Sequence, residues 1–154
     1  MVDRLLIRTD GASRSNPGPA SAGAVLIDAA LPDAAAVDAP VVSVVARPLG
    51  VQTNNVAEYT ALVLALREAQ RLGARSVDLR LDSKLIVEQL HGRWKVKDPK
   101  MREFWTEART LLGAFESWDA THEPRATNKA ADALANLALD DPAAAAELEA
   151  KYRG

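Results

Sequence analysis

The stretch Leu5-Leu6-Ile7-Arg8-Thr9-Asp10-Gly11 decides how the rest of the chain can be arranged. Its apolar run is typical of a buried strand, and the acidic residue followed by glycine indicates where that strand ends. The sequence therefore predicts a central strand over residues 3–10. This strand would deliver the Asp10 carboxylate to one edge of a sheet.

Two further β-rich segments follow, over residues 21–28 and 41–47. Together with the first strand they predict an antiparallel meander of three strands. The first connection, from Gly11 to Pro19, is rich in Gly, Pro, Ser and Asn and is expected to be a turn. The second, from Ala29 to Pro40, is rich in Ala, Asp and Pro and is expected to be an exposed hairpin loop.

The second half of the chain alternates helical and extended patterns. An apolar stripe predicts a helix from about Asn54 to Leu72, and Gly73 ends it. After it come a strand over 76–81, a helix over 83–91, a helix over 99–115 that Asp98-Pro99 opens, a strand over 117–122 and a helix over 126–139. This order predicts an α/β fold with a five-stranded mixed sheet, in which two parallel strands are added to the three antiparallel ones, and helices on both faces.

Length and composition place the chain among globular domains. It has 154 residues, of which 48% are hydrophobic, and this is enough for one packed domain. The absence of cysteine excludes disulfides, thiolate zinc sites and cysteine nucleophiles. No apolar run reaches membrane-spanning length and no export signal is visible, so a monomeric, soluble, cytoplasmic protein without a membrane partner is expected.

The formal net charge of −2 does not indicate a nucleic-acid binder, because such proteins usually carry a basic excess. Positive charge is gathered in one segment, which begins after His91 and contains a single acid, Asp98. Around Trp94 this segment holds five basic residues: Arg93, Lys95, Lys97, Lys100 and Arg102. The sequence therefore predicts modest rather than absent affinity for a phosphate backbone.

Four acidic residues stand where predicted elements begin or end: Asp10, Glu58, Asp82 and Asp132. Carboxylates at strand ends and helix starts can converge on one edge of a sheet, where cations make their mutual repulsion tolerable. Four carboxylates around two Mg²⁺ ions would make a phosphodiester-cleaving site. Taken singly, each has an ordinary explanation, because Asp after a strand forms turns, Asp82 can cap a helix, and Asp132 can form a solvated pair with Lys129.

Several short motifs occur in order along the chain: Thr9-Asp10-Gly11-Ala12-Ser13, Asn16-Pro17-Gly18-Pro19, Thr53-Asn54-Asn55-Val56-Ala57-Glu58, Asp82-Ser83, and His122 followed by Asp132. Each motif alone is weak, but in this order and spacing the chain resembles a type 1 ribonuclease H from about Arg4 to Leu139. The resemblance implies the ribonuclease H-like fold. It also implies a catalytic domain over residues 1–140, with residues 141–154 as a C-terminal helix or the edge of a linker.

The resemblance implies an activity and a cofactor as well. The chain is expected to be an endoribonuclease that hydrolyses the RNA strand of RNA/DNA hybrids with two Mg²⁺ ions, for which Mn²⁺ is the expected substitute. Asp10 would bridge both ions, Glu58 and Asp82 would complete the shell of one, and Asp132 would help to hold the other. A water molecule would attack phosphorus in line, and the products would carry 5′-phosphate and 3′-hydroxyl ends.

The resemblance also assigns side chains around the carboxylates. His122 matches a mobile histidine that assists proton transfer or product release, although a half-buried histidine at a strand end is the plainer explanation. Asn16 and Arg125 likewise have plainer explanations, as part of a turn and of the surface. The positions that match contacts to the hybrid are Gly11, Ala12, Ser13, Asn16, Thr53, Asn54, Asn55, Arg125 and Asn128.

Two features depart from the family. Many relatives carry a basic handle that grips the hybrid, and here only residues 93–97 remain of it. Val51 stands where several relatives place an arginine for a DNA phosphate. Trp94 is expected either to stack on a sugar or base of the DNA strand or to pack in the core against Trp105. Both departures predict a weaker grip on the hybrid with unchanged chemistry.

Other functions stay open at this point. One is a catalytically silent hybrid-binding or protein-interaction module on the same fold, which the four intact acidic residues disfavour. Another is a different nuclease of the superfamily, such as a transposase or junction resolvase, which the short chain and Asn16, Asn54 and Asn55 disfavour. The chain also resembles the ribonuclease H domain that is fused to a phosphatase in actinobacteria, so a further C-terminal domain is an open expectation.

Overall fold

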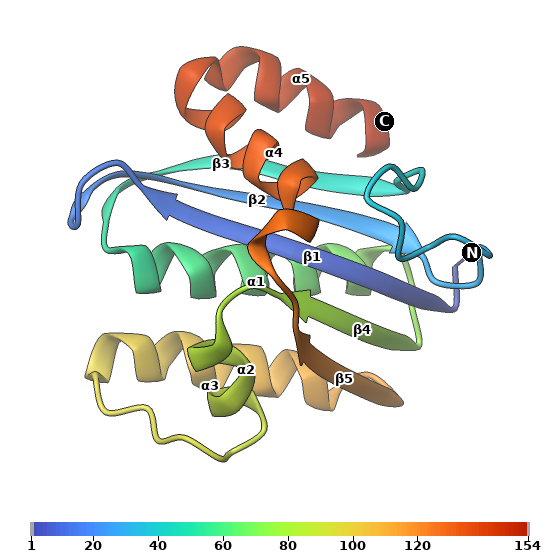
Figure 1. Ribbon diagram of the computed structural model, residues 1–154, viewed down its shortest axis with the longest axis horizontal. Helices are drawn as coiled ribbons and strands as arrows, with labels where there is room; N and C mark the ends of the chain where they lie inside the picture. The colour runs from blue at the N-terminus through green and yellow to red at the C-terminus, as the bar shows by residue number, and fades with distance from the viewer. Residues whose placement is uncertain (1, 154) are drawn as a thin grey trace.

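The computed structural model describes residues 2–153, and its centre is the strand that holds Asp10 (Figure 1). This strand, β1, lies in the middle of a five-stranded sheet with the order β3-β2-β1-β4-β5. β1 pairs with β2 and β2 with β3 in antiparallel fashion, whereas β1 with β4 and β4 with β5 are parallel. The strands are β1 (Arg4–Ser13), β2 (Gly18–Asp28), β3 (Ser43–Gln52), β4 (Ser76–Leu81) and β5 (Ser117–His122). The predicted mixed sheet is confirmed.

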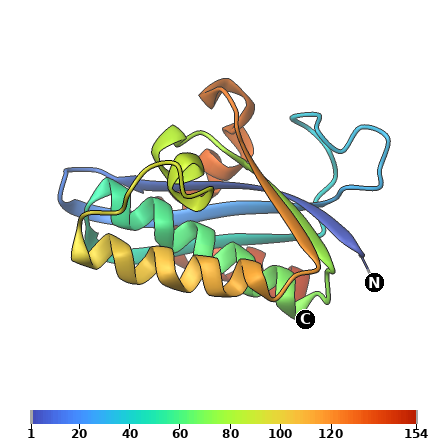
Figure 2. The same ribbon diagram turned by 90° about the horizontal axis from the view of Figure 1, so that it is seen from below.

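Helices cover both faces of this sheet. α1 (Asn54–Arg71) packs on β1 and β2, and α3 (Pro99–Gly113) lies beside α1, as Figure 2 shows from below. α4 (Lys129–Asp140) and α5 (Pro142–Arg153) pack on β2 and β3 from the opposite face. The short helix α2 (Lys84–Leu90) follows β4, and a single 3₁₀ turn, η1 (Arg125–Thr127), precedes α4.

The alternation of β1 side chains builds two cores. Leu5 and Ile7 point toward α1 and join the larger cluster, in which Leu62, Leu66 and Leu79 are also buried. Leu6 points the other way and joins Val25, Val44, Leu134 and Ala145 under α4 and α5. Full burial of one such Leu or Val side chain contributes about 1.5–3 kcal/mol, so both faces hold the central strand firmly.

Polar caps start the helices where the sequence predicts them. Thr53 accepts a hydrogen bond from the Val56 amide at the start of α1, and Ser83 accepts one from Ile86 at the start of α2. Asp98 caps α3 and Pro99 occupies its first turn. Gly73, with a φ of 78°, follows the end of α1 in the left-handed conformation that glycine adopts without strain.

Two strand glycines allow a helix to approach the sheet closely. A Cβ atom on Gly11 would lie 2.2 Å from the backbone of Ala57, so this glycine lets the first turn of α1 touch β1. A Cβ atom on Gly23 would lie 2.2 Å from the carbonyl oxygen of Ala131, so this glycine lets α4 touch β2. These two contacts set the positions of Glu58 and Asp132 relative to the sheet.

The main departure from prediction is the length of the first two strands. The sequence predicted a turn from Gly11 to Pro19, but Gly11 pairs with Ala22 and Ser13 with Ala20, so β1 and β2 continue and the turn shrinks to residues 14–17. β3 likewise runs on to Gln52, with a bulge opposite Ala20 and Ser21. Small residues carry no hydrophobic alternation, so only the register with a partner strand shows that they are extended.

The last segment is a packed helix. Ala145 and Glu149 of α5 are buried against β3, and the Arg153 guanidinium donates to the carbonyl oxygen of Val44. Within residues 2–153, no helix is long and apolar enough to cross a lipid bilayer.

Candidate metal centre and nucleic-acid interface

Three of the four predicted carboxylates meet at one edge of the sheet. Asp10, Glu58 and Asp82 each offer an oxygen atom, and these atoms lie within 4.8 Å of one another. β1 and β4 are parallel neighbours in which Thr9 pairs with Leu81, so the aspartates that follow these two residues come out side by side. Glu58 joins them from the first turns of α1, which Gly11 allows to approach.

Burial and crowding raise the proton affinity of this cluster. Burial, then the neighbouring carboxyl groups of Asp132 and Asp82, raise the pKa of Asp10 to about 7. Burial, then the charges of Asp82 and Asp10, raise the pKa of Glu58 to about 9. The positive charge of Arg125 opposes both shifts only in part. At neutral pH we therefore expect the cluster to bind protons or cations.

The donor set fits a hard divalent cation. The Oδ2 atom of Asp10 is buried and has no hydrogen-bond partner among residues 2–153, which is costly unless another species pairs with it. Carboxylate oxygens are the ligands that Mg²⁺ prefers. The residues that could hold a metal ion are therefore Asp10, Glu58 and Asp82.

Asp132 stands next to this group without belonging to it. It lies in the first turn of α4, where its amide donates to the carbonyl oxygen of Asn128. Its carboxyl group is close enough to Asp10 to raise the pKa of that residue. The role of a second metal ligand, which the resemblance implies for Asp132, stays a prediction.

A cavity of about 400 Å³ opens in front of the carboxylates. Six predicted hybrid-contacting residues line it together with Asp10, Glu58 and Asp82: Gly11, Ala12, Ser13, Asn54, Asn55 and Arg125. Ser83, which caps α2, also lines it. A neighbouring hollow of about 390 Å³ contains Asn16, Thr53, Asn54 and Asn55 together with Asp98 and Lys100. The sequence predicted Lys100 only as part of the basic segment and Asp98 only as a helix cap, because both belong to the distant start of α3.

Side-chain amides join the β1–β2 turn to the start of α1. The Oδ1 atom of Asn54 accepts a hydrogen bond from the Ser13 amide at 2.9 Å. The Oδ1 atom of Asn16 accepts one from the Asn54 amide at 3.1 Å. These bonds fix one wall of the cavity, so Asn16 and Asn54 shape the site whatever they contact in addition.

Asn128 lies beneath the cavity. It is 3% exposed, and its Nδ2 atom donates to the carbonyl oxygen of Thr9 at 2.8 Å and to Oδ2 of Asp82 at 3.3 Å. The sequence predicted a contact with the hybrid. That contact stays a prediction, and within the protein the amide has two partners, of which Asp82 belongs to the carboxylate cluster and Thr9 directly precedes Asp10.

His122 and Arg125 come from the connection between β5 and α4. His122 is exposed at the end of β5 and pairs with Leu81, the residue before Asp82, but it does not line the cavity. Arg125 does line the cavity, and its charge reaches both Asp10 and Glu58. The structure therefore brings Arg125 to the carboxylates and places His122 at the neighbouring strand end.

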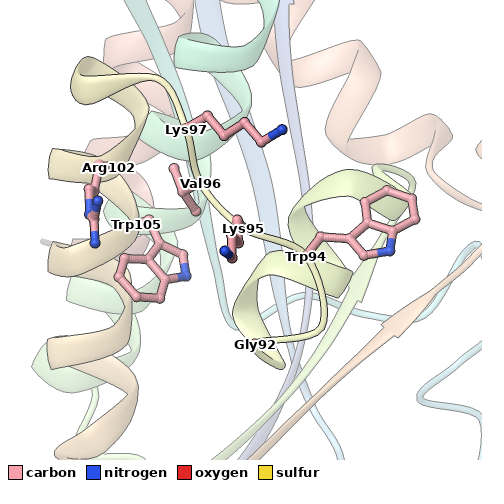
Figure 3. Close-up of a pocket in the computed structure, with 7 residues that line it drawn as sticks. All are labelled: Gly92, Trp94, Lys95, Val96, Lys97, Arg102 and Trp105. Carbon is pink, nitrogen blue, oxygen red and sulfur yellow. The ribbon is translucent and has the colours of Figure 1, made fainter.

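The shortened basic segment forms a separate hollow of about 640 Å³ (Figure 3). Its lining residues are Gly92, Trp94, Lys95, Val96, Lys97, Arg102 and Trp105. Trp94 is 45% exposed and lies on the opposite side of this hollow from Trp105 (Figure 3). The indole nitrogen of Trp105 donates to the carbonyl oxygen of Gln89. Trp94 is therefore not a core aromatic, and its stacking on a sugar or base of the DNA strand stays a prediction.

The sequence is similar to one family model and to several known proteins. A model of the reverse transcriptase-like family matches residues 8–138. The chain is 48% identical over 132 residues to ribonuclease HI of Halobacterium salinarum, an alignment that covers 86% of this chain and 62% of that protein. It is 41% identical over 147 residues to the bifunctional protein Rv2228c of Mycobacterium tuberculosis, which covers 96% of this chain and 38% of that protein. The chain thus spans less than two thirds of the length of either relative.

Solved structures agree with these sequences. The crystal structure of RNase H1 from Halobacterium salinarum has a TM-score of 0.81 and 46% identity, and covers 90% of this chain and 98% of that chain. The crystal structure of LC11-RNase H1 in complex with an RNA/DNA hybrid has a TM-score of 0.80 and 35% identity, over 90% of this chain and 98% of that chain. Similarity therefore extends over the sheet and all elements that carry the carboxylates.

Proposed function

The chain belongs to the type 1 ribonuclease H family, and from this premise we propose that it is a metal-dependent endoribonuclease that hydrolyses the RNA strand of RNA/DNA hybrids. One observation carries the proposal: the oxygen atoms of Asp10, Glu58 and Asp82 lie within 4.8 Å of one another, beside an open cavity. The similarity to LC11-RNase H1, which was solved with an RNA/DNA hybrid, supports the choice of substrate.

Asp10, Glu58 and Asp82 would hold one Mg²⁺ ion, and Asp10 with Asp132 would hold a second, with Mn²⁺ as the substitute. When bound, such ions lower the pKa of water and neutralise charge on a phosphodiester. The carboxylates themselves orient the phosphate by fixing where positive charge can lie. Because Asp10 stands between Glu58 and Asp132, it is the residue whose loss should matter most.

The remaining cavity residues would bind and orient the hybrid. The backbone of residues 11–13 and the side chain of Asn55, which line the cavity, would contact the RNA strand, where a 2′-hydroxyl distinguishes RNA from DNA. Arg125 would pair with a phosphate, and Trp94 would stack on the DNA strand. Water adds to phosphorus as the bond to the 3′-oxygen breaks, so the ends are 5′-phosphate and 3′-hydroxyl. His122 would carry a proton at this stage.

The direct test is cleavage of an end-labelled RNA/DNA hybrid in Mg²⁺, in Mn²⁺ and in EDTA, with duplex DNA and duplex RNA as comparison substrates. We expect cleavage of the hybrid alone, and only with a divalent ion. Asp10→Asn should lower the rate by about a thousandfold or more, since several kcal/mol of charge stabilisation are lost. Full hybrid cleavage by this variant would refute the carboxylate assignment, and hybrid binding without any cleavage would identify a silent binding module.

A further inference from the structure

Two arginines lie side by side in the sheet, directly behind the carboxylate cluster. Arg8 of β1 pairs in register with Arg80 of β4. Each stands two residues before an aspartate of the site, Asp10 or Asp82, and therefore on the same face of its strand. The side chain of Arg8 is 4% exposed and that of Arg80 is 27% exposed. Like charges opposite one another in a sheet are destabilising, so this pair needs a negative partner.

Glu123 is this negative partner, and both of its carboxylate oxygen atoms accept hydrogen bonds from the arginines. Its Oε1 accepts a hydrogen bond from Nε of Arg8 at 2.9 Å, and its Oε2 accepts one from Nη1 of Arg80 at 3.0 Å. The hydroxyl of Thr127 also donates to Oε1, at 3.2 Å. Burial raises the pKa of Glu123, but the bonds from Arg8 and Arg80 outweigh it and hold the pKa below its usual value. Glu123 is thus a carboxylate at neutral pH.

The arginines have further partners that keep them in place. Arg80 also bonds to Asp78, the carboxylate two residues before it, at 3.0 Å. The Nη2 atom of Arg8 donates to the carbonyl oxygen of Ala35 at 2.8 Å and so reaches the loop between β2 and β3. Glu123 therefore binds two guanidinium groups that are themselves fixed to the sheet and to a loop.

Glu123 lies inside the segment that carries two functional candidates, His122 and Arg125. His122 precedes it, and Arg125, which lines the cavity, follows it two residues later. The Glu123 amide donates to the carbonyl oxygen of Leu81 at 2.8 Å, next to Asp82. The segment is thus attached to the sheet through Glu123, and the Thr127 hydroxyl ties the far end of the segment back to the same carboxylate.

We propose that Glu123 is a positioning residue: the Arg8–Glu123–Arg80 bridge fixes residues 122–127 at the edge of the cavity, so that His122 and Arg125 meet the phosphate of the substrate. The inference rests on the proposed function, since that function gives these two side chains a substrate. It also explains why the strands keep buried charges here, because a buried ion pair contributes more to defined geometry than to stability.

The test compares Glu123→Gln with Glu149→Gln. Glu149 is also a buried glutamate with arginine partners, Arg47 and Arg153, but it belongs to α5 on a remote part of the sheet. Amide hydrogen exchange and hybrid cleavage are measured for both variants. Glu123→Gln should lower the protection of residues 122–127 at least tenfold and kcat/KM by about a hundredfold, as small misplacements near reacting groups do. Glu149→Gln should leave both unchanged at a temperature where each variant is folded.

Arg80→Met is a second variant for this test if Glu123→Gln does not fold. It should fold, because Arg80 is partly exposed and Arg8 retains its carboxylate partner. It should loosen the same segment to a smaller extent. Unchanged exchange at residues 122–127 in the folded variants would overturn the proposal, as would equal losses of activity in Glu123→Gln and Glu149→Gln. If the wild-type protein does not cleave hybrids, the proposed function is refuted. Hydrogen exchange at residues 122–127 would still show whether the Arg8–Glu123–Arg80 bridge fixes that segment.

Discussion

Asp10 and Glu58 make the folded protein sensitive to pH in the absence of metal. Their pKa values are raised from the ordinary 3.8 and 4.5 to about 7 and about 9. The unfolded chain gives up these protons near pH 4, whereas the folded protein retains them to higher pH. The free energy of unfolding of the metal-free protein should therefore be highest below about pH 4. It should fall as the pH rises from there through about 9.

Urea unfolding in EDTA at pH 5, 7 and 9 measures this dependence. Since one unit of pKa shift corresponds to about 1.4 kcal/mol and both pKa values are raised by several units, we expect a loss of several kcal/mol in the free energy of unfolding over this range. Glu58→Gln should flatten the curve, and Mg²⁺ should restore stability at pH 9 to the wild-type protein but not to that variant. A stability that rises with pH in EDTA would contradict the electrostatic description of the cluster.

Asn128 acts through Asp82. Its buried amide holds the Asp82 carboxylate and the Thr9 carbonyl group together. Asn128→Ala should therefore raise the Mg²⁺ concentration for half-maximal hybrid cleavage about 10- to 100-fold, which is usual when a group that orients a metal ligand is removed. Gln70→Ala is the control, because Gln70 is exposed near the end of α1 and does not line the cavity. Equal shifts in both variants would count against the role of Asn128.

At the scale of the elements, two glycines hold two helices against the sheet. Gly11→Ala should push α1 and Glu58 away from β1, and Gly23→Ala should push α4 and Asp132 away from β2. Overpacking of this kind costs about 1–3 kcal/mol. We expect both variants to melt at lower temperature, and both to lose hybrid cleavage beyond what unfolding explains. The measurements are thermal unfolding and cleavage at a temperature where each variant is folded.

Gly113→Ala controls for the added methyl group itself. Gly113 ends α3, and nothing lies within 4 Å of the position that a Cβ atom would take. This substitution should leave the cleavage rate unchanged and raise stability slightly, by about 0.5–1 kcal/mol, because alanine favours the helix. If Gly11→Ala were equally harmless, α1 would not depend on a close approach at β1.

The elements show which parts of the structure the sequence could predict. Strand and helix identities follow from local patterns, and so does the convergence of Asp10 and Asp82, because the ends of parallel strands meet. The extension of β1 through Ser13 could not be predicted, since its small residues show no alternation. Nor could the ion pair of Glu123, whose partner Arg8 is 115 residues away, or the burial of Asn128, for which only a contact with the hybrid was predicted.

At the scale of the whole molecule, α5 is part of the packed fold but contributes no residue to the carboxylate site. The carboxylates come from β1, α1, α4 and the end of β4, whereas α5 packs on β3 and α4. Its residues serve stability: Oε2 of Glu149 accepts the Ala46 amide at 2.8 Å, and Arg153 approaches Glu68 at 3.4 Å. We therefore keep residues 1–140 as the proposed catalytic unit and treat α5 as its cover on one face.

Deleting residues 141–154 tests this division. The deletion uncovers the apolar face around Val44 and leaves the Ala46 amide without its carboxylate, so we expect a loss of at least about 3 kcal/mol in the free energy of unfolding. At a temperature where the shortened chain is folded, kcat/KM for the hybrid should stay within about threefold of the full chain, because α5 packs on β3 and α4 and none of its residues lines the cavity. Arg153→Gln gives the milder version, with a smaller loss of stability and the same rate. If the shortened chain is folded but inactive, the catalytic unit includes α5 and its boundary lies beyond residue 140.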